Sequence, residues 1–331
     1  MTNEIYDAPD YVSTNGIKMA VYEAGPAGEA KGVPVVFLHG FPELAYSWRH
    51  QLPALAAAGY RAMAPDQRGN GLTDAPAAIE DYDMQHLTDD LVGLLDAKGV
   101  DKAVFCGHDW GAFITWALPF YCPERLAGLI ALNIPLMPRT EVPPIQRFNE
   151  VFGEANYINF FQNPGDGEAL LDADPERVIR FMMRHNMSGG KKAPDHPPSP
   201  SAMAFIHYIS ADESLWPGEP IPDETELAFY AETFKRTGFR GILNWYRNFD
   251  RNWHDAARFY ADSDTPQVPV PCLMILADED FICPPYWGKF LPNYCPDLEM
   301  HTIEGCGHWT QQEKPDEVNR LILDWLGRRF G

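Results

Sequence analysis

The stretch "VFCGHDWGAF" (residues 104–113) determines the expected fold. An apolar run ends in Gly107, and a second glycine, Gly111, lies two residues beyond Asp109. A sharp turn from a strand into a helix needs small residues at these positions, because its backbone is strained and the helix packs closely on the strand. Such a turn presents its middle residue at the carboxyl end of the strand. Asp109 is therefore a candidate nucleophile; the alternative is a plain helix N-cap, which aspartate also favours.

Strand and helix patterns alternate on both sides of this turn. Residues 11–25 indicate two short strands around a turn, and the run "VPVVFL" (33–38) is typical of a strand buried on both faces. The repetition predicts an α/β fold with a mostly parallel sheet and helices on both faces. Further strands are expected at 60–65, 102–107, 128–133, 269–277 and 298–303, and helices at 46–58, at 84–98, directly after Asp109, and at 313–328.

The alternation is interrupted between residues 136 and 250. This segment carries proline clusters such as "WPGEPIPDE" between helical, aromatic-rich stretches, and it contains no convincing strand. We therefore expect a core domain formed by residues 1–135 and 251–331, with residues 136–250 inserted as a helical cap domain.

Composition and charge exclude several classes of protein. The 331 residues are 45% hydrophobic and 22% charged, which is ordinary for a globular protein. Lys and Arg number 26 and Asp and Glu 47, so the net charge of −21 argues against a nucleic-acid partner. The start, "MTNEIYDAPDYV", has neither the basic nor the apolar segment of a secretory signal. The apolar runs are far too short for a membrane span. We expect a cytoplasmic protein with reduced cysteines.

A loop near the start supplies the first partner for Asp109. The segment "FLHGFPE" (37–43) follows a predicted strand and precedes a predicted helix. In folds of this kind, a backbone N–H of that loop and the N–H of the residue after the nucleophile bind an oxyanion. Phe41 and Trp110 are the candidate donors.

A histidine and an acid near the end of the chain complete the set. His308 lies in a glycine-rich loop after the predicted strand at 298–303, which suits a general base. In "ADEDF", Asp280 is the preferred residue to orient His308, and Asp278 is the alternative. Nucleophile, acid and histidine occur in the chain order of an α/β-hydrolase.

A carboxylate nucleophile narrows the chemistry. A serine that attacks an sp3 carbon forms a stable ether, whereas Asp109 would form an ester that water can cleave. His308 would activate that water, and Asp280 would hold the imidazole. The substrate is then an epoxide or a carbon that bears a halide. The two substrates differ in their leaving group. A halide leaves as a stable anion, whereas the oxygen of an epoxide needs a proton when the ring opens, and tyrosine is a suitable donor.

Two tyrosines of the inserted segment are candidate donors. Tyr246 shares a predicted helical face with Phe249, and Tyr157 precedes Phe160 and Phe161. On this pattern alone, both tyrosines are typical core residues, because an apolar stripe usually packs.

The chain resembles the soluble-type epoxide hydrolases of the α/β-hydrolase superfamily. The motifs "HGFPE", "DQRGNG", "GHDWG", "ADEDF" and "GCGHWTQ" occur in family order over nearly the whole chain, and "YINFFQNPG" and "FRGILNWYRN" match the cap motifs of epoxide hydrolases. The resemblance implies Asp109 as nucleophile, His308 as base and Asp280 as orienting acid. It also implies that Tyr157 and Tyr246 bind and protonate the epoxide oxygen.

The resemblance also implies a small-molecule epoxide as substrate and a vicinal diol as product, with neither cofactor nor metal. The sequence is compatible with a homodimer. We expect an apolar pocket between core and cap that prefers aryl or alkyl epoxides, lined by Phe41, Trp110, Phe160, Phe161 and Trp309.

Four other classes of protein fit these residues less well. A haloalkane dehalogenase shares Asp109 and His308, but it usually has an asparagine where this chain has Phe41. A fluoroacetate-type dehalogenase would favour arginine where this chain has Trp110. A non-catalytic ligand receptor is disfavoured because every catalytic residue is retained. A metal hydrolase is disfavoured because the ten histidines show no H-E-x-x-H or comparable spacing.

Overall fold

The structure is a computed structural model that describes residues 4–26, 28, 30–185 and 206–331. Within these residues, the strands are β1 (Asp10–Thr14), β2 (Ile17–Ala24), β3 (Val35–Leu38), β4 (Ala62–Pro65), β5 (Ala103–His108), β6 (Leu126–Leu132), β7 (Cys272–Ala277) and β8 (Leu298–Ile303). They form one sheet in the order β1-β2-β4-β3-β5-β6-β7-β8. β2 pairs antiparallel with β1 and with β4, and all other neighbours are parallel.

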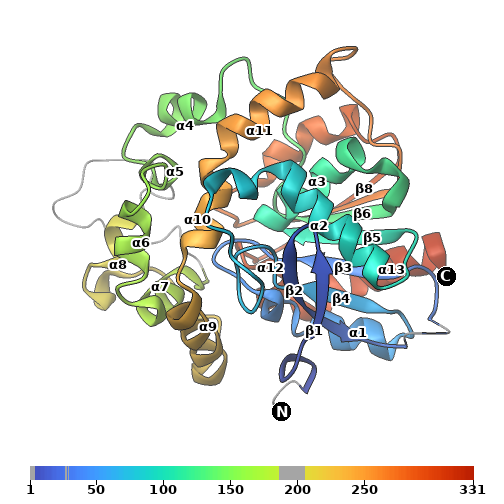
Figure 1. Cartoon of the computed structure of the whole chain (residues 1–331), viewed down its shortest axis with the longest axis horizontal. Helices are drawn as coiled ribbons and strands as arrows, with labels where there is room; N and C mark the ends of the chain where they lie inside the picture. The colour runs from blue at the N-terminus through green and yellow to red at the C-terminus, as the bar shows by residue number, and fades with distance from the viewer. Residues whose placement is uncertain (1–3, 27, 29, 186–205) are drawn as a thin grey trace.

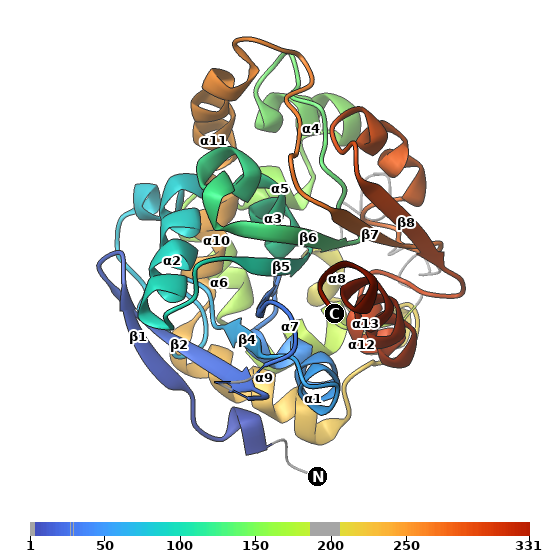
Figure 2. The same cartoon turned by 90° about the vertical axis from the view of Figure 1, so that its right-hand side faces the viewer.

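Helices cover both faces of this sheet (Figures 1 and 2). Alternate residues of each central strand face opposite cores: Val36 packs with the helices on one side, and Val35 packs with those on the other. Each such side chain stabilises the folded state by about 1.5–3 kcal/mol when it is fully buried. Because both faces of the central strands are buried, these strands are apolar throughout. The first core includes α2 (Met84–Ala97) and α3 (Trp110–Tyr121), and the second includes α1 (Gln51–Ala57) and α13 (Pro315–Phe330).

Two predicted helices are interrupted in the structure. The helix expected at 46–58 is a 3₁₀ turn over Ala45–Trp48 followed by α1. Pro53 lies in the first turn of α1, where its missing N–H costs no hydrogen bond. The predicted last helix is likewise divided, into α12 (Thr310–Glu313) and α13, which begins at Pro315. A proline is tolerated at the start of a helix but not in its interior.

The segment between β6 and β7 is helical. As predicted, its described part contains no strand and only an isolated bridge between Arg184 and Pro220. The predicted end of the cap at residue 250 lies within α11 (Phe249–Ala256), so the division into two domains stays a prediction. The helices are α4 (Pro144–Phe152), α5 (Tyr157–Phe160), α6 (Asp166–Leu171), α7 (Pro175–Met182), α8 (Ile206–Ile209), α9 (Glu224–Thr237), α10 (Arg240–Arg247) and α11 (Phe249–Ala256).

These helices gather on one side of the sheet (Figure 1). The ring of Tyr246, from α10, lies 5.3 Å from that of Phe41 in the loop after β3 and 5.1 Å from that of Trp110 at the start of α3. The inserted segment therefore covers the carboxyl ends of the central strands. Of the helices that the structure describes, none is both long and apolar enough to cross a bilayer.

Candidate active site

Asp109 lies at a sharp turn between β5 and α3. Its φ of 51° and ψ of −120° are uncommon for a residue other than glycine. A Cβ atom at Gly107 would lie 2.1 Å from the carbonyl oxygen of Gly111, and one at Gly111 would lie 2.0 Å from that of Leu38. The two glycines thus allow the close approach that the sequence predicts. The carboxylate makes no capping hydrogen bond to α3, so capping is not what it does here.

The loop after β3 supplies a backbone donor to this carboxylate. The N–H of Phe41 donates a hydrogen bond of 2.7 Å to Asp109 Oδ1. Gly40 packs directly against the carboxylate, because a Cβ atom there would lie 2.4 Å from Asp109 Cβ. A donor in this position stabilises negative charge on the carboxyl oxygen. The corresponding role of the Trp110 N–H stays a prediction.

His308 lies between two carboxylates. Its Nδ1 is 3.0 and 3.1 Å from the two carboxylate oxygens of Asp280, and its Nε2 is 3.7 Å from Asp109 Oδ2. Nε2 therefore faces the carboxylate that is the candidate nucleophile. Asp278 instead accepts a hydrogen bond of 3.2 Å from the N–H of Cys306. The structure thus brings the preferred acid, rather than the alternative, to the histidine.

Neighbouring charges set the pKa values of His308 and Asp280. Burial disfavours the imidazolium, but the carboxylates of Asp280 and Asp109 outweigh burial and raise the pKa of His308 well above its usual value. Burial also raises the pKa of Asp280, yet His308, the N–H of Cys283 and the amide of Asn133 outweigh it and hold that pKa below its usual value. In the free protein at neutral pH, His308 is therefore an imidazolium between two carboxylates.

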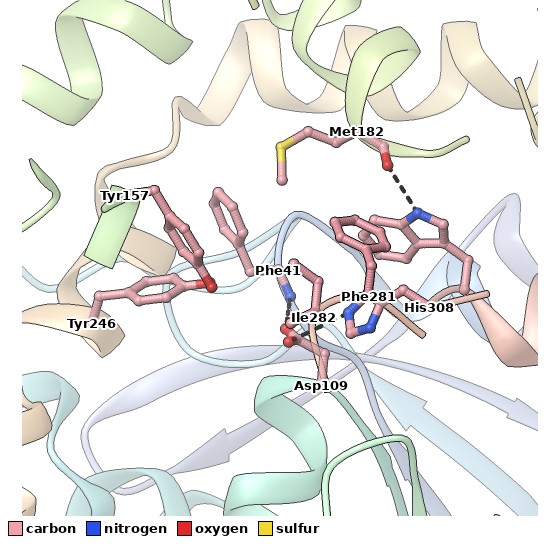
Figure 3. A pocket seen from close by; sticks show the side chains of 9 residues that line it. Phe41, Asp109, Tyr157, Met182, Tyr246, Phe281, Ile282 and His308 are labelled. Atoms are coloured by element: carbon pink, nitrogen blue, oxygen red, sulfur yellow. Dashed lines mark hydrogen bonds and ion pairs between the residues drawn. The ribbon is translucent and has the colours of Figure 1, made fainter. Parts of the chain in front are cut away.

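Tyr157, at the start of α5, and Tyr246, in α10, face Asp109 from the inserted segment. Their ring centroids are 5.8 Å apart, and Figure 3 shows their hydroxyl ends meeting beside Phe41, on the side of Asp109. Burial raises the pKa of both phenols. The negative charge of Asp109 raises both pKa values further. The hydrogen bond between the two hydroxyls lowers the pKa of Tyr157 and raises that of Tyr246. Both tyrosines are thus protonated far beyond neutral pH because they are buried in an aromatic cluster.

A narrow pocket contains these groups (Figure 3). Two of the predicted apolar lining residues, Phe41 and Trp309, lie on it. Three more apolar residues line it without having been predicted. The complete lining is Phe41, Asp109, Tyr157, Met182, Tyr246, Phe281, Ile282, His308 and Trp309.

The other predicted lining residues lie behind the pocket wall. Phe161 is fully buried, and its ring is 5.6 Å from that of Phe41 and 5.5 Å from that of Tyr157. Phe160 packs on Phe161, with their ring centroids 6.0 Å apart. Trp110 packs against the ring of Tyr246, as described above. These residues support the wall because their side chains point into the core, a direction that residue type does not reveal.

A buried ion pair lies beneath the pocket. Glu43, whose side chain is fully buried, accepts a hydrogen bond of 2.9 Å from the N–H of Gly40, and its Oε2 lies 2.7 Å from His108 Nδ1. His108 Nε2 lies 2.8 Å from the carbonyl oxygen of His308. The two ring nitrogens of His108 therefore contact the Glu43 carboxylate on one side and the backbone beside the base on the other. Burial raises the pKa of Glu43, but His108 and the Gly40 N–H outweigh it and lower that pKa to about 2.

This ion pair ties three segments of the site together. Glu43 Oε1 also accepts hydrogen bonds of 2.8 and 2.9 Å from the side-chain amides of Gln311 and Gln312. The loop with Phe41, the turn before Asp109 and the segment after the base are therefore joined at one carboxylate. Sequence reasoning missed this role, although a charged residue in the apolar loop "HGFPE" is a usable signal.

Replacing Glu43 by alanine is expected to lower the free energy of unfolding by about 3–5 kcal/mol, because the Gly40 N–H, the His108 ring and two side-chain amides lose their buried acceptor. Urea unfolding at pH 7 measures the effect. The exposed Glu154 provides the control, since its replacement by alanine should change the value by less than about 0.5 kcal/mol. A loss for Glu43→Ala as small as the control's would contradict the assignment.

Comparison with known proteins agrees with the fold. A sequence model of the alpha/beta hydrolase family matches residues 35–321. The protein is therefore a member of the α/β-hydrolase family.

The relatives define a narrower group. The chain is 44% identical to epoxide hydrolase A of Mycobacterium tuberculosis over 95% of this chain and 96% of the relative. A crystal structure of epoxide hydrolase A from Mycobacterium thermoresistibile superimposes with a TM-score of 0.84 at 39% identity, covering 98% of this chain and 99% of that one. Bifunctional epoxide hydrolase 2 of Sus scrofa is 36% identical over 94% of this chain, which spans 53% of that longer protein. The chain belongs to the epoxide hydrolases of the α/β-hydrolase family.

Proposed function

We propose that the protein hydrolyses small-molecule epoxides to vicinal diols in two steps, through an ester on Asp109. One observation supports this most directly: a carboxylate, an imidazole and two protonated phenols line the same pocket. An epoxide needs a nucleophile for a ring carbon and an acid for the ring oxygen. Asp109 faces Tyr157 and Tyr246 in a way that suits both needs at once.

In the first step, a carboxylate oxygen of Asp109 attacks a ring carbon, and the carbon–oxygen bond of the epoxide breaks. The departing oxygen takes a proton from the Tyr157–Tyr246 pair, which leaves a hydroxyalkyl ester and a tyrosinate. His308 starts as an imidazolium. Its proton balances the charge of the tyrosinate, and its transfer leaves a neutral imidazole and restores the phenol.

In the second step, the neutral His308 removes a proton from water, and the oxygen of that water attacks the carbonyl carbon of the ester. The N–H of Phe41, which already donates to Asp109 Oδ1, stabilises the negative charge on the carbonyl oxygen. Collapse breaks the ester bond. The diol oxygen takes the proton of the new carboxyl group, so Asp109 returns as a carboxylate and His308 as an imidazolium.

The apolar part of the pocket indicates which epoxides fit. Phe41, Met182, Phe281, Ile282 and Trp309 surround the reacting groups. We expect aryl and alkyl epoxides to be preferred over small polar ones, because binding buries their apolar surface. A panel in which small polar epoxides have the higher kcat/KM would contradict this preference.

Removing the phenol hydroxyls should slow the first step. General acids typically contribute 10²- to 10⁴-fold to a rate. Tyr157→Phe and Tyr246→Phe are each expected to slow ester formation about 10²-fold, and the double variant roughly 10³- to 10⁴-fold. Single-turnover rapid quench, followed by intact-mass measurement, gives this rate.

Tyr60→Phe is the matched control, because the Tyr60 hydroxyl is buried with no hydrogen-bond partner within the described part of the chain. It should keep the wild-type rate. Ester formation at the wild-type rate in the double variant would exclude the two tyrosines as the acid.

The pH dependence should differ between the free protein and the ester. In the free protein, Asp109 helps to raise the pKa of His308. Ester formation removes that charge, so the pKa of His308 falls and the neutral base forms more readily. Hydrolysis of the ester should slow as the pH falls through this lower pKa. NMR titration of His308 in the free protein should give a higher value than the acid limb of the hydrolysis rate; equal values would contradict this role of Asp109.

Product analysis separates this function from its nearest rival. A dehalogenase with the same nucleophile would release halide from a haloalkane. We expect a styrene-type epoxide to give the vicinal diol and a haloalkane of similar size to give no halide. Halide release without diol formation would favour the rival. Neither product, with biological activity retained in an Asp109→Ala variant, would favour a receptor.

A further inference from the structure

A carboxylate in the short helix after the base holds the backbone on both sides of that base. Glu313 is the last residue of α12, and its side chain is 3% exposed. Its Oε2 accepts a hydrogen bond of 3.0 Å from the N–H of Gly307, and its Oε1 accepts one of 3.0 Å from the N–H of Trp309. These two residues flank His308. Buried hydrogen bonds between a carboxylate and backbone N–H groups are among the stronger ones in proteins.

Gly307, the residue before His308, leaves room for the Glu313 carboxylate because it has no side chain. A Cβ atom at Gly307 would lie 2.9 Å from Glu313 Oε1 and 3.3 Å from its Oε2. A larger residue would therefore displace the carboxylate.

The same carboxylate connects the base loop to the inserted segment. His185, which follows α7, lies with its Nδ1 2.9 Å from Glu313 Oε2. The indole N–H of Trp309 donates a hydrogen bond of 2.8 Å to the carbonyl oxygen of Met182, and Met182 lines the pocket. The loop of the base is thus fastened to the segment that carries the phenols.

We propose that Glu313 is a positioning residue for His308, acting through the backbone of residues 307–309 and, by way of His185, joining that loop to the cap. This inference rests on the proposed function, in which His308 acts as a base only on the water of the second step. A loosened loop should therefore slow ester hydrolysis and leave ester formation unchanged. A general loss of folding would instead reduce the amount of protein that reacts at all.

The test compares Glu313→Gln with Glu317→Gln in single-turnover reactions with a styrene-type epoxide, followed by intact mass. Glutamine is isosteric, but its amide presents an NH₂ group to one of the two backbone donors. Glu317, which is exposed on α13, loses the same charge without touching the loop. We expect Glu313→Gln to slow ester hydrolysis about 10- to 100-fold, as small displacements of catalytic groups do, and to let the ester accumulate. Its ester formation should stay within about threefold of wild type.

Two further variants complete the experiment. Gly307→Ala should slow the same step, because its methyl group displaces the carboxylate, and His185→Gln should slow it by a smaller factor. Wild-type hydrolysis in both Glu313→Gln and Gly307→Ala, or an equal loss in both steps, would overturn the inference. Absence of any ester in His308→Gln would instead overturn the proposed function itself.

Discussion

Replacing Asp109 by alanine is expected to reduce kcat/KM for an epoxide by about 10⁴-fold or more, which is the loss typical for a nucleophile that acts with a base as a unit. Asp280, the other carboxylate at His308, is not available to take its place, because it already accepts hydrogen bonds from Asn133, Ile282 and Cys283. Steady-state kinetics with a styrene-type epoxide measures the loss, and intact mass should show no adduct.

The folded state of Asp109→Ala must be checked alongside its activity. The N–H of Phe41 loses its acceptor, which costs about 1–3 kcal/mol if water does not replace it. Relief of the strained backbone does not offset this, since alanine is also disfavoured at a φ of 51°. A protein that is folded by thermal unfolding and still turns over at even a tenth of the wild-type rate would contradict the role of Asp109.

Replacing His308 by glutamine is expected to separate the two steps. Ester formation does not need a base, so it should remain within about tenfold of wild type, whereas hydrolysis should slow about 10³-fold or more because no group activates water. The ester should therefore accumulate to one equivalent per protein. Intact-mass spectrometry should show the mass of the epoxide added to the protein, and digestion should locate it on the peptide that contains Asp109.

His254→Gln is a matched control for this experiment, because His254 lies exposed on α11. It should show wild-type rates for both steps and no accumulated ester. If His308→Gln turned over normally and carried no adduct, the two-step route would be excluded.

The sequence predicts the parts of the site that depend on local spacing. Gly107 and Gly111 identify the turn because each is needed for a contact that no side chain tolerates. The central strands are recognisable since both of their faces are buried, which leaves an uninterrupted apolar run. Helix ends were less predictable: the breaks before α1 and before α13 depend on single prolines whose effect varies with their position in a turn.

Contacts between distant segments explain what the sequence could not predict. Asp278 and Asp280 both follow the same predicted strand, so the sequence does not distinguish them. The loop after β8 does, because Asp278 accepts a hydrogen bond from Cys306 and Asp280 accepts one from His308. Glu313 has the pattern of an ordinary surface acid, and only folding buries it against backbone N–H groups.

The predicted pocket lining differs in part from the lining in the structure for a related reason. Residue type favours aromatic side chains such as Phe161, but the direction of a side chain is set by the packing of several helices. In the structure, Phe161 points into the aromatic core, and Met182 from α7 lines the pocket instead. Phe281 and Ile282 were more accessible to prediction, because they directly follow Asp280 at the carboxyl end of a central strand.

In the proposed mechanism, the carboxyl group of Asp109 first attacks the substrate and then becomes the acyl part of the ester that water cleaves. A single turnover in ¹⁸O-labelled water, with protein in excess over epoxide, tests this directly. The two-step mechanism predicts an unlabelled diol and one ¹⁸O atom in the side chain of Asp109, found by mass spectrometry of its peptide. A labelled diol with an unlabelled Asp109 would mean that water opens the ring itself, which would exclude the ester on Asp109.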